Sequence, residues 1–253
     1  MTRRVLRSAT LGAVGAAAGL VCLIAAYGAR PAIVLDMDRD LPSVTIGFFD
    51  VERSGEGTYA WTSERADVTL RGLDRRVPWT CAIALRAARA EPPLPTVRIA
   101  IDGLEVYDGA TTGGAVRIEV AVPVRRGADG LRLTLRVSPT FVPGPEDPRR
   151  LGVQVDRLSC EPAGAMPWPP SRAMAAAALS TAALAAAFAV MGLPTLAVLG
   201  GIAILAPVQA WVLASGVALV SSYIDLVPWL AFWVGVGAVA LVAVLTRYPG
   251  ASD

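Results

Sequence analysis

One long segment of this chain is almost free of charge, because Asp225 is the only charged side chain between Ala173 and Thr246. The 143 residues from Arg30 to Arg172 differ sharply, since they hold 19 arginines and 19 acidic residues. About 20 consecutive apolar residues are enough to cross the roughly 30 Å hydrocarbon core of a bilayer. The contrast predicts a membrane protein with one polar domain inserted between a single N-terminal span and a C-terminal group of spans.

Four segments are long and apolar enough to be transmembrane helices. They are Ser8 to Ala29, Ala173 to Met191, Leu193 to about Ser215, and Val227 to about Leu245. Arg3, Arg4 and Arg7 precede the first span and Arg247 follows the last, so the positive-inside rule places both ends in the cytoplasm. A cleaved signal peptide is the alternative for the first segment, and the uncharged turn at Met191 to Thr195 leaves a re-entrant pair open. We expect a bacterial inner-membrane protein whose polar domain is extracytoplasmic.

The expected organisation has five parts. They are residues 1–29 (cytoplasmic flank and first span), 30–165 (external domain), 166–172 (a collar rich in Pro and Trp), 173–247 (three spans) and 248–253 (cytoplasmic tail). Trp168, Trp229 and Trp233 are expected at the membrane interface, where tryptophan is enriched. The alanine-dense segment from Ala173 to Val190 is predicted to pack on other helices, because small side chains allow close approach. Asp225 is expected in a loop near the lipid headgroups.

The external domain has a hydrophobic pattern of period two, which indicates half-buried antiparallel strands. Apolar residues alternate with Arg, Thr or Glu in most of the runs Val68–Leu70, Cys81–Leu85, Val97–Ile101, Val116–Val120, Leu131–Val137 and Val153–Val155. Asp102-Gly103, Asp108-Gly109 and Asp129-Gly130 are the expected turns between them. About eight such strands predict an all-β sandwich or jelly roll.

Two of the three cysteines, Cys81 and Cys160, lie in this domain. Disulfides persist outside the cytoplasm, so we predict that the two are joined, with two buried free thiols as the alternative. Cys22 lies alone in the first span and is expected to act as a small apolar residue.

The composition excludes several kinds of chemistry. The chain has no His, and the sequence also contains no Lys and no Asn, so all 23 basic residues are Arg. An imidazole base, a Schiff-base lysine and a histidine metal ligand are therefore absent. We expect no catalytic centre, no metal and no cofactor. Nucleic acid is not an expected partner either, because a charge-balanced domain lacks the basic face that it requires.

Two groups of motifs in the external domain carry a family resemblance. Gly47-Phe48-Phe49-Asp50-Val51-Glu52, Thr58-Tyr59-Ala60-Trp61-Thr62 and Ala66-Asp67-Val68-Thr69-Leu70 form the first, and Pro139 to Gly144 with Asp147 to Val153 form the second. They resemble the opening and the close of a β-sandwich module near the N-terminus of bacterial GT-C-type, glycosyltransferase-like polytopic membrane proteins. The resemblance implies lipid-linked sugar donors and a catalytic acid soon after the first span, where Asp36-Met37-Asp38 lies. Two aspartates at this spacing are common, so we expect a solvated linker there instead. Such enzymes need many more helices, so an intact enzyme of this class is not expected.

Jelly-roll modules also bind carbohydrate by stacking exposed aromatic faces on sugar rings. Tyr59, Trp61, Trp79 and Tyr107 are the candidates, and core packing is the alternative for Trp61.

Three functions follow. The favoured hypothesis is a non-catalytic accessory or scaffold subunit of a larger bioenergetic or envelope-synthesis complex, with membrane lipids and other integral membrane subunits as partners. The alternatives are a carbohydrate-binding module that binds envelope glycans, and a truncated or split glycosyltransferase.

Overall fold

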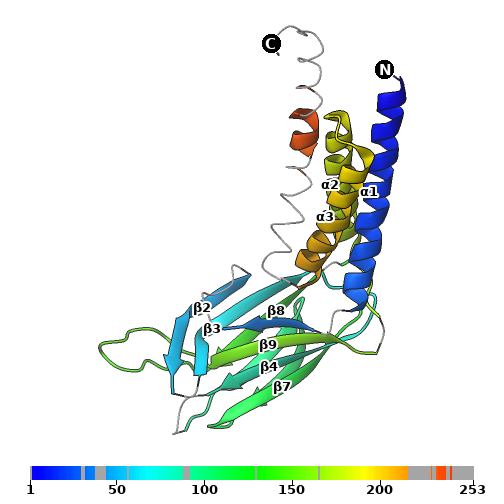
Figure 1. Ribbon diagram of the computed structural model, residues 1–253. Coiled ribbons are helices and arrows are strands. Elements are labelled where there is room, and N and C mark those ends of the chain that lie inside the picture. The colour runs from blue at the N-terminus through cyan, green and yellow to red at the C-terminus, as the bar shows by residue number, and fades with distance from the viewer. Residues whose placement is uncertain are drawn as a thin grey trace. The chain divides into compact units, whose positions relative to one another are not determined.

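The computed structural model describes residues 2–29, 32–37, 44–55, 57–87, 92–128, 130–164 and 166–215, together with residues 229, 232–237 and 240. The chain forms two compact units (Figure 1). Pro31–Pro167 makes up the β unit, and Met1–Arg30 with Trp168–Asp253 makes up the helical unit. The β unit is therefore an insertion in the helical unit, as the distribution of charge predicts.

The helical unit contains α1 (Thr2–Gly28), α2 (Ser171–Val190) and α3 (Thr195–Ser215), which run side by side in Figure 1. Each contains a segment long and apolar enough to cross a membrane: Val5–Gly28, Ser171–Val190 and Thr195–Ala214. Three of the predicted spans are thereby confirmed as helices. Most of the fourth, with Asp225 and the tail, lies outside the described residues, although residues 232–237 are helical.

Helices α1 and α2 approach closely because α1 presents glycines to its neighbour. A Cβ atom on Gly15 would lie 2.8 Å from the carbonyl oxygen of Thr181, and one on Gly19 would lie 2.7 Å from that of Ala177. Gly15 and Gly19 form a G-x-x-x-G pair, a pattern that permits tight packing of transmembrane helices. The prediction that the alanine-dense helix packs on protein is confirmed, and α1 of the same chain is one of its partners.

The buried polar side chains between α2 and α3 bond to each other and to the helix backbone. Ser180 Oγ and Thr181 Oγ1 each lie 2.9 Å from the side-chain amide oxygen of Gln209. The same two hydroxyl oxygens lie 2.6 and 2.8 Å from the carbonyl oxygens of Ala176 and Ala177 in the preceding turn of α2, so each hydroxyl has two acceptors within reach of its single hydrogen. This matters in a bilayer, because no water is available there to satisfy an unpaired polar group.

Arg7 of α1 supplies a positive charge to the turn between α2 and α3. Its guanidinium donates a hydrogen bond to the carbonyl oxygen of Leu193. Gly192 in the same turn has a φ of +88°, a conformation that glycine adopts without strain. The turn that carries no charge of its own in the sequence therefore lies at the same end of the bundle as the arginines of the N-terminus.

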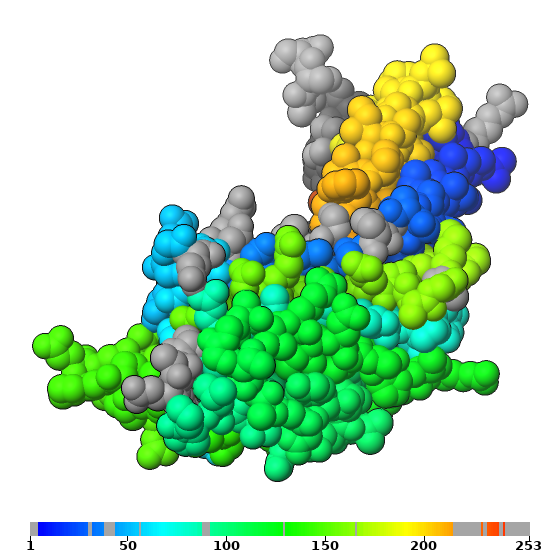
Figure 2. Space-filling model, turned by 90° about the horizontal axis from the view of Figure 1, so that it is seen from below, coloured from blue at the N-terminus to red at the C-terminus, as the bar shows by residue number. Residues whose placement is uncertain are grey.

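Within the described residues, the β unit is built from nine antiparallel strands. They are β1 (Ile33–Asp36), β2 (Thr45–Ser54), β3 (Gly57–Arg71), β4 (Trp79–Arg86), β5 (Thr96–Ile101), β6 (Leu104–Ala110), β7 (Ala115–Val122), β8 (Gly130–Ser138) and β9 (Gln154–Pro162). Their order is β6-β5-β8-β3-β9-β4-β7, with β1 added beside β9 and β2 beside β3. Figure 2 shows the surface of this unit, with the green segments that include β6 and β7 in the foreground.

The long strand β3 is shared by the two layers of the sandwich. Its C-terminal part, Arg65–Arg71, pairs with β8, whereas Ala60 and Trp61 pair with β9. One layer is therefore β6-β5-β8-β3 and the other is β9-β4-β7. Both layers contribute alternate residues that are almost completely buried, including Ile99 and Leu133 from the first and Ile83 and Leu158 from the second. This confirms the predicted all-β sandwich and gives it a hydrophobic core.

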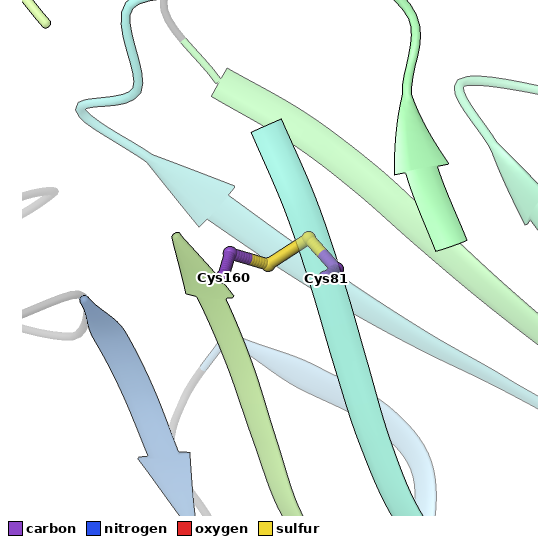
Figure 3. The surroundings of a disulfide bond; sticks show 2 residues. All are labelled: Cys81 and Cys160. Atoms are coloured by element: carbon purple, nitrogen blue, oxygen red, sulfur yellow. A yellow bond between two sulfur atoms is a disulfide. The ribbon is translucent and has the colours of Figure 1, made fainter. Parts of the chain in front are cut away.

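Cys81 of β4 and Cys160 of β9 are directly opposite in the register and form a disulfide, with a Cα–Cα separation of 4.1 Å (Figure 3). Both are fully buried. The predicted pairing is confirmed, and it joins positions 79 residues apart in the sequence. Cys22 remains a free thiol in α1.

A buried arginine donates hydrogen bonds to three separate segments at one end of the sandwich. The guanidinium of Arg75, 1% exposed, donates to Asp102 Oδ2 at 2.7 Å and to the carbonyls of Gly130 and Pro123 at 2.9 and 2.7 Å. Asp102 also accepts from the backbone N–H of Arg132 at 2.9 Å. Burial by itself raises the pKa of Asp102, but the bonds and charges of the surrounding groups, Arg75 among them, outweigh it and hold the pKa below its usual value.

Two local expectations need correction. Asp108-Gly109 is not a turn but lies inside β6, where Asp108 pairs with Arg98 of β5 and the Tyr107 ring occupies the space beside Gly109. Asp102-Gly103 does form the β5–β6 turn, with positive φ at both residues, whereas Asp129 lies outside the described residues.

The second correction concerns the segment after the first helix. A solvated linker is expected for Asp36-Met37-Asp38, yet Ile33–Asp36 is strand β1. Asp36 forms an ion pair with Arg157 at 3.2 Å and Met37 is fully buried, while Asp38 lies outside the described residues. A strand of four residues is too short to show a period in the sequence.

Candidate functional site

The two groups of motifs from the sequence meet in space at the β2–β3 hairpin. The ring of Trp61 in β3 lies 5.5 Å from that of Phe141, and Arg149 Nη2 lies 2.9 Å from Glu52 Oε1 in β2. Phe141 and Arg149 belong to the connection between β8 and β9. The backbone fixes the arrangement, because the Gly152 N–H donates to the Thr62 carbonyl at 2.7 Å.

The carboxylate of Glu52 is the centre of this cluster. Its Oε2 accepts hydrogen bonds from Trp61 Nε1 at 3.2 Å and from the Tyr59 hydroxyl at 3.5 Å. Arg149 links it to Asp147, whose Oδ2 lies 2.7 Å away from the same guanidinium nitrogen. Burial first and the charge of Glu52 second raise the pKa of Tyr59 above 10.0, so its phenol is neutral at physiological pH. The hydrogen bonds from Arg149 lower the pKa of Asp147.

A pocket of about 290 Å³ opens beside Tyr59. It is formed by the tip of the β2–β3 hairpin, the end of β4 and the first residues of β7 and β9. Its polar lining groups come from Thr58, Tyr59, Arg86, Arg117, Gln154 and Asp156. An aromatic ring next to a few convergent donors and acceptors is the usual chemistry of a small-molecule site. Guanidinium, carboxamide and carboxylate groups together can serve both the donor and the acceptor side of neighbouring hydroxyls on a ligand.

The structure separates the aromatic residues that the sequence singles out. Tyr59 and Trp61 lie together, with ring centroids 6.1 Å apart, and Tyr59 alone of the pair lines the pocket. Trp61 is 6% exposed, so it fits the core-packing alternative, and Trp79 is 1% exposed and donates to the Asp74 carbonyl. Tyr107 lies opposite Ile99 in the register, on the side of β6 that faces the interior.

Sequence reasoning missed the polar part of the site. Glu52, Arg86, Gln154 and Asp156 are isolated in the sequence, and no local spacing connects them. Only Glu52 lies in a stretch singled out by the family resemblance. Within the described residues, no group of three or more acidic or cysteine side chains is placed to hold a metal ion.

The three tryptophans expected at the membrane interface are all substantially exposed, at 50% for Trp168, 59% for Trp229 and 54% for Trp233. The rings of Trp229 and Phe232 are stacked with centroids 5.7 Å apart, and Trp233 packs edge-on against Trp229. Their place at an interface stays a prediction.

No protein-family model and no curated protein sequence matches the chain. Solved structures that resemble it include the C-terminal CBM6 of LamC, a marine laminarinase from Zobellia galactanivorans (10% identity, 51% of this chain, 98% of that chain, TM-score 0.34). A family 35 carbohydrate binding module from Clostridium thermocellum is also similar (12% identity, 52% of this chain, 98% of that chain, TM-score 0.34). So is the CBM22-1–GH10 structure of Clostridium thermocellum xylanase 10B (10% identity, 53% and 29% coverage, TM-score 0.39).

Proposed function

We propose that this protein is a membrane-anchored glycan-binding module that acts by binding rather than catalysis. The observation that carries the proposal is the pocket beside Tyr59, whose lining joins an aromatic ring to two guanidinium groups, a carboxylate and a carboxamide. Small-molecule sites usually occupy about 300–1,000 Å³, so a pocket of about 290 Å³ suits a short part of a glycan, such as one sugar ring. The remaining sugar units would extend into solvent.

We further propose that the β unit lies outside the cytoplasm of a bacterial inner membrane. The Cys81–Cys160 disulfide supports this placement, because such bonds persist in oxidising compartments. The charge of Arg7 at the α2–α3 turn supports a cytoplasmic position for that turn, since positive residues favour the cytoplasmic side. Glycans of the cell envelope are then the ligands within reach.

A glycan array probed with the full-length protein in nanodiscs tests this function. We expect binding to an envelope glycan, and we expect Tyr59→Ala to weaken it about tenfold, which corresponds to roughly 1.4 kcal/mol. Tyr107→Ala is the matched control, because that tyrosine lies in β6 and does not line the pocket. Binding that survives Tyr59→Ala, or the absence of any bound glycan, would contradict the proposal. Trp61→Ala is unsuitable as a test because Trp61 is buried and its loss would disturb packing.

The accessory-subunit hypothesis stays a prediction, and the alanine-dense helix no longer supports it. Part of its basis was the alanine-dense helix, and that helix already packs against α1 of the same chain through Ala177, Thr181 and Ala185. Purification in mild detergent distinguishes the hypotheses, since a scaffold subunit would be recovered with a stoichiometric partner. The likeness to GT-C-type proteins is likewise kept as a proposal about ancestry of the sandwich, and the meeting of its two groups of motifs supports it.

A further inference from the structure

Three arginines stand in a row across the outer face of the β3-β8-β5 layer. Arg136 of β8 is directly opposite Arg65 of β3 on one side and Arg98 of β5 on the other. Residues directly opposite in an antiparallel pair have Cβ atoms about 4.5–5.5 Å apart and point to the same face. We call Arg65, Arg136 and Arg98 the arginine row.

The row is a feature that folding alone would disfavour. Like charges directly opposite each other destabilise a sheet, and the row contains two such pairs. The outer face of the other layer is built differently, because Arg117 and Arg157 are both opposite Ala84 there. A negatively charged ligand would be attracted by the concentrated positive charge, so anion binding would account for the arginine row.

The centre of the row is not neutralised by the chain. Arg65 lies 3.2 Å from Asp67 and Arg98 lies 3.0 Å from Asp108, and both arginine side chains are more than half exposed. Among the described residues, Arg136 has no acidic partner, and it is exposed. Its guanidinium is therefore available to an anion from solvent.

Two surface hollows adjoin the row and share all three of its arginines. One, of about 800 Å³, adds Arg150 and Glu64 to its lining, and the other, of about 460 Å³, adds Arg125 and Arg132. Asp102 and Glu105 also line the smaller hollow. Arginines outnumber acidic residues in the lining of both hollows. This face is therefore basic, although the domain as a whole has equal numbers of arginine and acidic residues.

We propose that the arginine row binds the phosphate groups of a linear anionic polymer. Guanidinium groups hold phosphate oxygens in pairs of parallel hydrogen bonds, and each phosphate that joins two units of a linear polymer keeps a negative charge at neutral pH. A row of three sites with hollows on both sides suits repeated charges along a chain rather than one small ion. The arginine row shares no lining residue with the Tyr59 pocket, so it does not depend on the proposed glycan site.

The experiment is calorimetric titration of the full-length protein, in nanodiscs of phosphatidylcholine at low ionic strength, with sodium tripolyphosphate. We expect binding that weakens about tenfold in Arg136→Gln and decreases with added salt, because the attraction is electrostatic. Arg157→Gln is the matched control, since Arg157 is an exposed strand arginine with an acidic partner on the other layer, and we expect it to bind as the wild type does. Arg136→Gln removes repulsion, so its thermal stability should equal or exceed that of the wild type.

Each other result overturns the proposal. Undiminished binding by Arg136→Gln would show that the arginine row is not the binding site. Equal weakening by Arg157→Gln would show only a general effect of the protein's charge. Equal affinity for a polyuronate of the same charge would overturn the choice of phosphate. Association with phosphatidylglycerol vesicles that tripolyphosphate cannot compete away would assign the row to lipid headgroups instead of a polymer.

Discussion

The helical unit and the β unit solve the same problem, the burial of polar groups, in opposite ways. In the described parts of α1, α2 and α3 the buried polar side chains are uncharged, as with Ser180, Thr181 and Gln209. Close contact between α1 and α2 depends on the absence of side chains at Gly15 and Gly19. The β unit buries an arginine outright and joins its strands by a disulfide. Lipid offers no compensation for an unpaired charge, whereas a domain in water can pair charges at its edge.

Removal of the disulfide should have the largest effect on stability and only in the β unit. For a loop of this length the expected loss in the double variant Cys81→Ala/Cys160→Ala is about 4 kcal/mol in the free energy of unfolding. Denaturant unfolding of the full chain in detergent, with and without reductant, measures it. Cys22→Ala is the control and should be nearly neutral, and a reductant that leaves the wild type unchanged would refute the expectation.

Loss of the buried guanidinium should be the next largest effect. Arg75→Leu removes the buried guanidinium that donates to the Asp102 carboxylate and to the Pro123 and Gly130 carbonyls, so we expect a loss of about 3 kcal/mol. Arg157→Leu removes a surface ion pair and should cost at most about 1 kcal/mol. Thermal unfolding monitored by β-sheet circular dichroism separates the two, and equal losses would show that burial of Arg75 is unimportant.

The helical unit should respond to added atoms rather than to lost charge. Gly19→Ala places a Cβ against the Ala177 backbone, and overpacking of this kind costs about 1–3 kcal/mol. Gly12→Ala is the matched control, because its Cβ would meet the Ala182 carbonyl at an ordinary 3.5 Å. The measurement is thermal unfolding of the helical signal in lipid nanodiscs. Identical melting of the two variants would mean that α1 and α2 are not closely packed at Gly19.

The smallest expected effect is acid sensitivity of the β unit. Burial raises the pKa of Asp67, but hydrogen bonds from Arg132 and Thr134 and the charges of Arg132 and Arg65 outweigh it, so the pKa lies below 3.8. A pKa lowered by folding stabilises the native state above the unfolded-state value, and the contribution is lost as the pH falls through the folded-state pKa. Stability should therefore be level above about pH 5 and decline in more acidic solution.

Asp67→Asn tests that source of the decline. The variant should be less stable than the wild type at neutral pH, and the difference should narrow as the pH falls below 4 in urea titrations. A difference that stays constant with pH would show that the charge of Asp67 contributes nothing.

Particular elements show which parts of the fold the sequence could predict. The α1, α2 and α3 segments follow from hydropathy, and strands such as β5 and β8 follow from alternation. Strand β1 escaped because it has four residues, and Asp108-Gly109 misled because an ion pair and a packed ring outweigh its turn preference.

The candidate sites were less accessible for a physical reason. Tyr59 was predicted as a ligand contact, but its neighbours in the pocket come from four strands. The arginines of β3, β5 and β8 each look like ordinary solvent-facing residues in their own strands, and total charge balance argued against any basic face.

Hydropathy and alternation in the amino-acid sequence were enough to show which segments are apolar enough to cross a membrane and that the intervening domain is made of strands. The sequence also indicated which two cysteines could pair. These properties depend on local periodicity and composition, which act over a few residues. The pairing of Arg136 with Arg65 and Arg98 across neighbouring strands, and the bonds from Glu52 to Trp61 and Arg149, follow from the folded arrangement alone. Strand order and register set those neighbours, and register is fixed by how whole layers bury their apolar faces against each other.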